Sequence, residues 1–341
     1  MTVAAACRTG RAAGLPGQRG LSLVELLISM LLGLFLTSGM VSAYLESSRN
    51  FIFEEQAARM QENGRYASTL LKRELAMAGF FGGSLAMDTV AAQAVGTDCG
   101  DAGWALDGSS PLDLVDNHQG QSTPVTRNAV TLVCLDGASI EPLTDVVAVK
   151  RTAGEASMRD GTTAPGFTAS TGEQWYLRQT NYRHSRWQKL RPVDLYDAAG
   201  PAAPVTFWEA SAKIFYIRRY SDSGVTPDGV PTLCAESLVG NHMSTRCLVE
   251  GVENLQVEFG IDTDGDGVAN RYDAAPDAVA LAGAVSVKIY LLLRSLHEIA
   301  GYRNDKTYTL GRHRIAPGQD GFMRRVFTTT VQLRNRIVSI G

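Results

Sequence analysis

The residues best suited to binding chemistry lie between Asp262 and Asp273. Carboxylates occupy the first, third and fifth positions of this stretch, a glycine the sixth, an asparagine the ninth and an aspartate the twelfth: Asp262, Asp264, Asp266, Gly267, Asn270 and Asp273. This is the spacing of a calcium loop, in which oxygen donors surround a hard cation, the main chain of Val268 adds a carbonyl, and glycine permits the tight turn. Three neighbouring carboxylates repel one another unless a cation separates them. We therefore expect Ca²⁺ to bind here.

Two features distinguish this Asp-rich loop, residues 262–273, from a complete EF-hand. Its twelfth residue is Asp273 rather than glutamate, which shortens the reach of the last ligand, and a predicted strand rather than a helix leads into it. The alternative is a solvated turn between two strands, because aspartate and glycine both favour turns.

Catalytic patterns do not accompany the loop. His297-Glu298 lacks the second histidine of a zinc-protease helix, no glycine-rich phosphate loop occurs, and no serine or cysteine lies in a nucleophile elbow. The five histidines are scattered, and we expect each to be a surface or core residue. The sequence therefore predicts a protein that is not an enzyme.

Basic and aromatic side chains are interleaved in a basic segment, residues 178–191, which suits an acidic polymer such as DNA. Its members are Arg178, Arg183, His184, Arg186, Trp187, Lys189 and Arg191. The whole chain, however, has a formal net charge of −3, which becomes −6 without the three arginines of residues 1–20, and so offers no general footprint for nucleic acid. We favour a solvated face or a subunit contact over nucleic-acid binding.

The cysteines predict disulfides. Cys7 lies in the basic amino-terminal stretch, and the remaining four are Cys99, Cys134, Cys234 and Cys247. An even number without metal-site spacing favours two disulfides in an oxidising compartment such as the periplasm. Among the possible connectivities we favour Cys99–Cys134 and Cys234–Cys247, because cysteines that are near each other in the sequence can be bonded without a particular arrangement of the rest of the chain. Buried free thiols are the alternative.

One charge stands out near the amino terminus. Residues 21–45 are almost wholly apolar and carry a single charged side chain, Glu25, whereas the preceding residues hold three arginines and no acid. A carboxylate within a membrane span costs roughly a few kcal/mol, so it requires a partner. If the chain is cut between Gly20 and Leu21, the new α-amino group of Leu21 is a cation that Glu25 of a neighbouring subunit can neutralise.

At these residues the chain resembles the type IV prepilins and the pseudopilins of type II secretion. Their short basic leader ends in glycine, here Gly20, and their mature chain has glutamate at its fifth position, here Glu25; the first mature residue, usually phenylalanine or methionine, is Leu21. Three further stretches resemble PilW-like minor pilins: 70–80, 252–262 and 327–335. The resemblance implies that prepilin peptidase cleaves between Gly20 and Leu21 and methylates Leu21, and that Glu25 acts in assembly.

The resemblance further implies a structural function. A PilW-like protein joins other minor pilins and the major pilin in a complex that primes a type IV pilus on the inner-membrane assembly platform, and it stands at the pilus tip, where it can meet an adhesin. Twitching motility, adhesion and DNA uptake are the activities served. Such a protein starts in the inner membrane, with one span and a periplasmic head, and ends in the extracellular pilus. The alternatives are a minor pseudopilin of type II secretion (PulJ/GspJ-like) and, from another class, a membrane-anchored periplasmic binding protein or enzyme.

A long helix is the first element that must position these residues. Residues 1–20 are a removable leader, and residues 21–45 are long enough to span a bilayer. From residue 46 to residue 82, apolar residues recur at spacings of three and four, which indicates one buried face: Phe53, Ala57, Met60, Gly64, Ala67, Leu71, Leu75 and Ala78. Glycines at 79, 82 and 83 predict the end of the helix. A signal peptide cut after Ala43, or an uncleaved anchor, leaves Glu25 unexplained.

Residues 83–341 predict a β-rich head. Strands are expected at 129–134, 146–151, 174–178, 213–220, 254–259, 285–293 and 327–333. Loops are expected at 83–124, at 154–172 and between Cys234 and Cys247. An antiparallel sheet with one apolar face needs a cover, which the helix supplies. The predicted fold class is α+β and pilin-like, with a long amino-terminal helix, half of it in the membrane, packed on a mainly antiparallel sheet.

Overall fold

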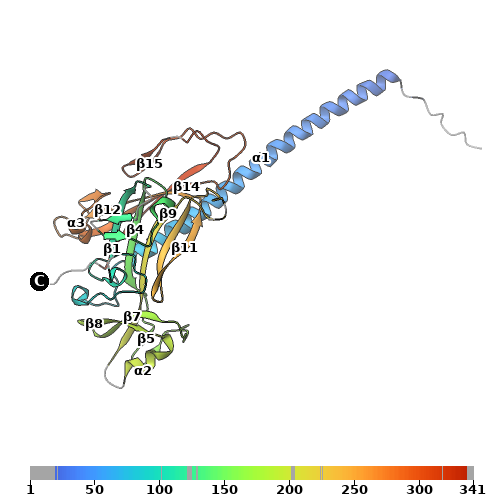
Figure 1. Ribbon diagram of the computed structural model, residues 1–341. Helices are drawn as coiled ribbons and strands as arrows, with labels where there is room; N and C mark the ends of the chain where they lie inside the picture. Colours follow the sequence, from blue (N-terminus) through green and yellow to red (C-terminus); the bar gives the residue numbers. More distant parts are fainter. Residues whose placement is uncertain are drawn as a thin grey trace, which may run out of the picture. The chain divides into compact units, whose positions relative to one another are not determined.

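The computed structural model describes residues 20, 22–100, 102–120, 125–127, 130–200, 204–222, 224, 226–316 and 318–335 (Figure 1). The chain divides into two compact units between Ile52 and Phe53, and helix α1 (Leu23–Ala76) contributes residues to both. The predicted leader up to residue 19 and the first predicted mature residue, Leu21, lie outside the described residues.

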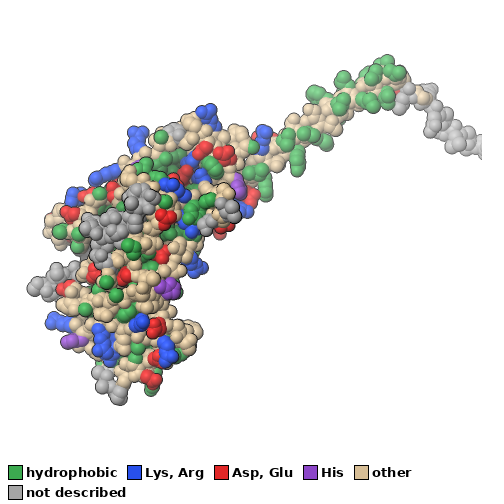
Figure 2. Space-filling model, viewed as in Figure 1, with side chains coloured by type: hydrophobic (Ala, Val, Ile, Leu, Met, Phe, Trp, Pro, Cys, Tyr) green, Lys and Arg blue, Asp and Glu red, His purple; other side chains and the backbone are tan. Residues whose placement is uncertain are grey.

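The described part of the amino-terminal unit is the first half of α1. Its large apolar side chains are exposed and include Leu23, Phe35 and Met40 at 73%, 78% and 75% exposure. Figure 2 shows hydrophobic side chains along the visible face of this helix. A helix that is apolar all round belongs in apolar surroundings. By length and composition, this helix can cross a membrane.

From Phe53 onward, α1 buries one face in the head. Met60, Ala67, Leu71 and Leu75 are at most 5% exposed, and the charged residues predicted to lie outside this stripe are exposed: Glu62, Arg65, Lys72 and Arg73. The predicted apolar stripe is therefore confirmed from Met60 to Ala78, whereas its first member, Phe53, is 40% exposed.

Two glycines of this region are required by their surroundings. A Cβ on Gly64 would lie 2.4 Å from the ring of Phe327, so glycine allows α1 to approach the sheet closely. The helix ends at Ala76, and Gly79 follows with a φ of 74°, where a Cβ would lie 2.4 Å from the carbonyl oxygen of Asn335.

The larger sheet has nine antiparallel strands (Figure 1). Its main path is β1 (Leu112–His118), β4 (Thr144–Thr152), β9 (Thr206–Arg218), β10 (Thr232–Val239) and β11 (His242–Glu250). The long strand β9 also pairs with two hairpins, β5 (Met158–Arg159) with β6 (Thr162–Thr163), and β7 (Gln174–Asn181) with β8 (His184–Leu190).

The second sheet has four antiparallel strands in the order β13 (Arg271–Asp273), β12 (Val252–Ile261), β14 (Ala284–Arg294) and β17 (Arg324–Gln332). Two small hairpins are β2 (Val125–Arg127) with β3 (Val130–Leu132), and β15 (Tyr308–Leu310) with β16 (His313–Ile315). The short helices are α2 (Leu195–Ala199), α3 (Ala278–Ala282) and the 3-10 turns η1 (Met87–Thr89), η2 (Trp104–Leu106), η3 (Gly137–Ser139) and η4 (Pro192–Asp194). The predicted α+β fold class, with its long amino-terminal helix and antiparallel sheets, is confirmed.

The core fills both faces of the larger sheet, because neighbouring residues of a strand point to opposite sides. Val147 and Phe215 face the α1 stripe and the second sheet. Val146 and Ile214 face the segment that precedes β1, including Trp104. A smaller cluster surrounds Tyr176 and Phe207 next to α2.

Buried polar groups join the two sheets where β4 approaches the part of β12 that does not pair with β13. The carboxylate of Asp145 accepts hydrogen bonds from the main-chain N–H groups of Val257 at 2.7 Å and Asn117 at 2.9 Å. Close by, the carbonyl of Leu143 accepts one from the side chain of Asn254 at 3.0 Å. Burial raises the pKa of Asp145 to about 8, although the two N–H groups act in the opposite direction.

One carboxylate of α1, Glu74, is buried against the larger sheet. Its Oε1 accepts a hydrogen bond from Lys213 Nζ at 2.6 Å, and its Oε2 accepts two from the guanidinium of Arg151 at 2.8 and 3.0 Å. Burial alone raises the pKa of Glu74, but the hydrogen bond from Lys213 and the charge of Arg151 outweigh it and lower the pKa. Since Lys213 lies on β9 and Arg151 on β4, this ion pair ties α1 to two neighbouring strands.

Three stretches predicted as loops contain strands. β1 lies within the predicted loop 83–124, β5 and β6 lie within the predicted loop 154–172, and the predicted loop between Cys234 and Cys247 is the β10–β11 hairpin. Polar residues such as Asp116, Thr162 and Thr245 interrupt the apolar alternation there, so the pattern did not indicate strands. The strand predicted at 129–134 is shorter, since β3 ends at Leu132.

Candidate functional site

The Asp-rich loop connects two strands of the second sheet, β12 and β13. Carboxylate oxygens of Asp262, Asp264 and Asp266 lie within 4.8 Å of one another. The turn that brings them together uses left-handed glycines, because Gly265 and Gly267 have φ angles of 83° and 85°.

Main-chain N–H groups orient these carboxylates. Asp262 accepts hydrogen bonds from Gly265 at 2.7 Å and Gly267 at 2.9 Å, and Asp266 accepts one from Val268 at 2.7 Å. The N–H of Gly267 lowers the pKa of Asp262, which favours its charged form at neutral pH. Three carboxylates with only oxygen donors fit a hard cation such as Ca²⁺.

The second half of the loop departs from the predicted ligand set. Asn270 is engaged inside the loop, since its Oδ1 accepts from the N–H of Thr263 at 2.6 Å and its Nδ2 donates to Asp264 at 3.1 Å. Asp273 does not join the three carboxylates and instead forms an ion pair with Arg271 at 3.3 Å. The reason is that β13 pairs with the end of β12 and places Asp273 opposite Phe259, whereas an EF-hand continues into a helix.

The predicted processing and assembly residues lie at the start of α1. Gly20 is exposed, and Glu25 stands in the first turn of the helix, where it is also exposed. The main-chain carbonyl of Glu25 accepts a hydrogen bond from the hydroxyl of Ser29 at 2.7 Å. Within the described ranges, its carboxylate has no ion-pair partner.

Both favoured disulfides are present. Cys99 is bonded to Cys134, which ties the segment before β1 to the turn after β3. Cys234 is bonded to Cys247, its cross-strand partner in the β10–β11 hairpin. The two bridges cross-link the β-rich head with the predicted connectivity.

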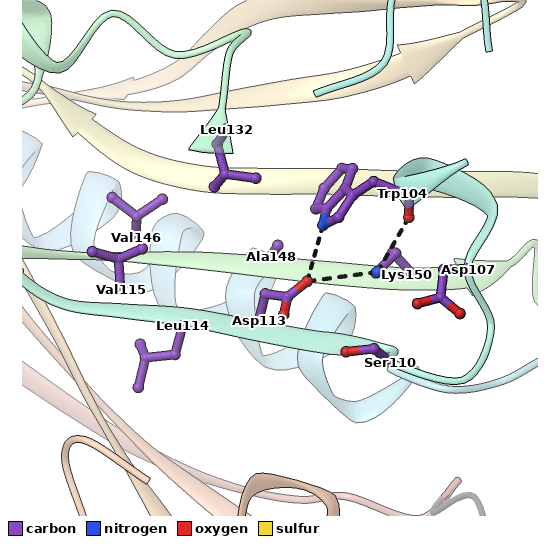
Figure 3. A pocket seen from close by; sticks show the side chains of 10 residues that line it. All are labelled: Trp104, Asp107, Ser110, Asp113, Leu114, Val115, Leu132, Val146, Ala148 and Lys150. Atoms are coloured by element: carbon purple, nitrogen blue, oxygen red, sulfur yellow. Dashed lines mark hydrogen bonds and ion pairs between the residues drawn. The ribbon is translucent and has the colours of Figure 1, made fainter. Parts of the chain in front are cut away.

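A small pocket on the outer face of the larger sheet contains a buried lysine (Figure 3). Lys150 Nζ donates to the carbonyl of Trp104 at 3.2 Å and lies 3.5 Å from a carboxylate oxygen of Asp113, which also accepts from the indole N–H of Trp104 at 3.1 Å. Burial lowers the pKa of Lys150, and Asp113 opposes this effect. The cavity of about 120 Å³ is smaller than the 300–1,000 Å³ typical of ligand sites. We interpret the lysine as part of the packing beneath Trp104.

The basic segment forms the turn and second strand of the β7–β8 hairpin, together with Arg178 on β7. Two of its cations are paired with acids outside the hairpin, Lys189 with Glu173 at 2.9 Å and Arg191 with Asp194 at 2.5 Å. Figure 2 shows Lys and Arg side chains and a histidine over the end of the head where β7 and β8 lie. The cross-strand register of the segment could not be inferred from composition.

Comparison with known proteins finds one family whose model matches part of the chain. Residues 214–335 match the family described as Type IV Pilus-assembly protein W, PilW, which confirms the PilW resemblance from the second half of β9 through β17, the Asp-rich loop included. A solved structure, a type IV-like pilin from Thermus thermophilus, is similar at 14% identity and a TM-score of 0.39, over 81% of this chain and 96% of that one. No curated protein matches the chain significantly.

Proposed function

We propose that this chain is a minor pilin, a structural subunit that takes part in priming a type IV pilus and belongs to its tip complex. The observation that carries the proposal is the match of residues 214–335 to the PilW family. On this proposal the chain acts by assembly rather than by catalysis, and its partners are other minor pilins, the major pilin, prepilin peptidase and the inner-membrane assembly platform. An adhesin at the tip is a further partner.

The amino-terminal half of α1 supports the same role. Over residues 23–45 it exposes apolar side chains and carries one carboxylate, Glu25, in its first turn. In a bundle of such helices, a terminal amine at Leu21 of one subunit pairs with Glu25 of its neighbour, and burial in an apolar environment strengthens that attraction. The helix thus serves first as an inner-membrane anchor, with the head in the periplasm, and later as part of the filament.

The first experiment is mass spectrometry of the amino terminus of protein recovered from membranes, with and without co-expressed prepilin peptidase. We expect a terminus at Leu21, carrying a methyl group, only when the peptidase is present. An intact Met1, or a terminus at residues 42–44, in the presence of the peptidase contradicts the proposal and points to an anchored protein of another class.

The second experiment compares two glutamates of α1. We expect Glu25→Ala to insert in the membrane yet to reduce the number of pili and its own recovery from sheared filaments. Glu46→Ala, an exposed glutamate beyond the apolar stretch, serves as the matched control and should assemble normally. Equal assembly of both variants contradicts the role of Glu25. Loss of protein secretion with intact pili instead identifies a pseudopilin.

We also propose that Asp262, Asp264 and Asp266 hold Ca²⁺ and stabilise the turn between β12 and β13. The support is the group of three carboxylates within 4.8 Å, whose mutual repulsion a cation removes. When Ca²⁺ exceeds its Kd about 100-fold, binding to the folded state alone adds about 2.7 kcal/mol of stability.

Thermal unfolding of the full chain in detergent tests the calcium proposal. We expect Ca²⁺ to raise the Tm, Asp266→Asn to abolish the rise, and Asp305→Asn, an exposed aspartate outside the loop, to leave it unchanged. A parent protein whose Tm does not respond to Ca²⁺ disproves the metal site without affecting the pilin proposal.

A further inference from the structure

Strand β8 is an open edge of the larger sheet. It pairs with β7 on one side, and within the described residues no strand pairs with its other side. Alternate residues of an edge strand direct their N–H and C=O groups outward, where they can bond a further strand.

The charged side chains of the β7–β8 hairpin are all basic. Residues 174–193 include five Lys and Arg side chains and no acid. The pairs with Glu173 and Asp194 occupy Lys189 and Arg191. The side chains of Arg183 and Arg186 are exposed and have no hydrogen bond or ion pair among the described residues.

Two arginines of the hairpin stand directly opposite each other. Arg178 on β7 is the cross-strand partner of Arg186 on β8, and like charges in this position repel. The Nε of Arg178 is buried and lacks a hydrogen-bond partner in the described part of the chain. Burial and the charge of Arg186 both lower the pKa of Arg178. A negatively charged group beside Arg186 would relieve this repulsion.

We propose that the β8 edge binds an extended acidic segment of a partner protein, which adds to the sheet as a tenth strand. Main-chain hydrogen bonds along β8 supply the affinity, and acidic side chains opposite Arg186 supply the selectivity. This inference goes beyond the proposed pilin function and does not depend on it.

The charge of the edge selects the partner. A second copy of β8 would bring His184, Arg186 and Lys189 against the same residues and is repelled, which is how edge strands avoid self-association. A nucleic acid would use the charges but not the outward N–H and C=O groups, since it has no strand to pair. An acidic strand satisfies both the charges and the backbone.

Fluorescence anisotropy with the full chain in detergent tests the proposal with four labelled probes. They are a peptide of alternating glutamate and valine, the same peptide with N-methylated alternate residues, a lysine-valine peptide and a single-stranded oligonucleotide. We expect the glutamate peptide to bind at least tenfold more tightly than each of the other three, because only it offers both acidic side chains and a complete backbone.

Two charge reversals locate the site. Arg186→Glu should weaken binding of the glutamate peptide at least tenfold. Arg246→Glu, an exposed arginine on another edge strand of the same sheet, β11, should leave it unchanged. Equal loss in both variants, equal binding of the N-methylated peptide, or oligonucleotide binding as tight as that of the peptide overturns the proposal.

Discussion

Replacement of Glu74 by glutamine tests how α1 is held on the head. Glu74→Gln keeps the shape of the side chain but removes the charge that faces Arg151 and Lys213. Breaking a buried ion pair by removing one partner costs about 3–5 kcal/mol. We expect a cost near the lower end of this range. Arg151 is 11% exposed and is left without its carboxylate, but the side chain of Lys213 is 28% exposed and can be hydrated instead.

A loss of about 3 kcal/mol lowers the Tm of a unit as long as Phe53–Gly341 by about 5 °C, at an unfolding entropy of about 2.1 cal/mol/K per residue. Thermal unfolding of the full chain in detergent, followed by near-ultraviolet circular dichroism, measures it. Glu62→Gln, on the exposed face of the same helix, should change the Tm by no more than about 2 °C. Adding Arg151→Met to Glu74→Gln should recover part of the loss, since no buried cation then lacks a partner.

The ion pair of Glu74 with Arg151 and Lys213 also predicts how the stability of the fold changes with pH. The pKa of Glu74 is lowered below its ordinary 4.5, so its contribution is present above pH 4.5 and is lost as the pH falls through the folded-state pKa. The difference in Tm between the parent and Glu74→Gln should therefore be constant near neutral pH and shrink only in acid. Equal Tm values for Glu74→Gln and Glu62→Gln, or a difference that does not shrink in acid, refute the reasoning.

Three further predictions use the same unfolding assay. Because burial raises the pKa of Asp145 from 3.8 to about 8, its contribution is present at acidic pH and falls as the pH rises from about 4 to about 8; Asp145→Asn should flatten this slope. Gly64→Ala places a methyl against the ring of Phe327 and should cost about 1–3 kcal/mol, which Phe327→Leu partly restores. Replacing Cys99 and Cys134 by alanine should cost about 4 kcal/mol, against about 3 for the hairpin disulfide, because it opens a loop of 35 rather than 13 residues; equal losses contradict the loop-length argument.

The helix was predictable because its signals are local. Apolar residues at spacings of three and four mark the buried stripe, and glycines mark the end. The ion pair of Glu74 was not predictable, since Arg151 and Lys213 lie 77 and 139 residues away in sequence. Only the pairing of β4 with β9 brings the two cations to the same place on the sheet.

The Asp-rich loop likewise contains one feature that the local sequence predicts and one that depends on the fold. The grouping of Asp262, Asp264 and Asp266 follows from alternate spacing and glycine turns, so the local pattern was sufficient. The place of Asp273 depends on which element follows the loop. Because β13 returns along β12, Asp273 is drawn into the strand pair and toward Arg271, away from the other carboxylates.

Arg178 and Arg186 face each other on the β7–β8 hairpin only because the strand pairing shifts by one residue. A bulge between Gln179 and Asn181 shifts the pairing after the turn. Without the bulge, the register set at the turn would place Arg186 opposite Gln179, and its side chain would then point to the face opposite Arg178. Composition alone revealed a basic segment, but the bulge decides that two of its cations lie opposite each other on the same face of the hairpin.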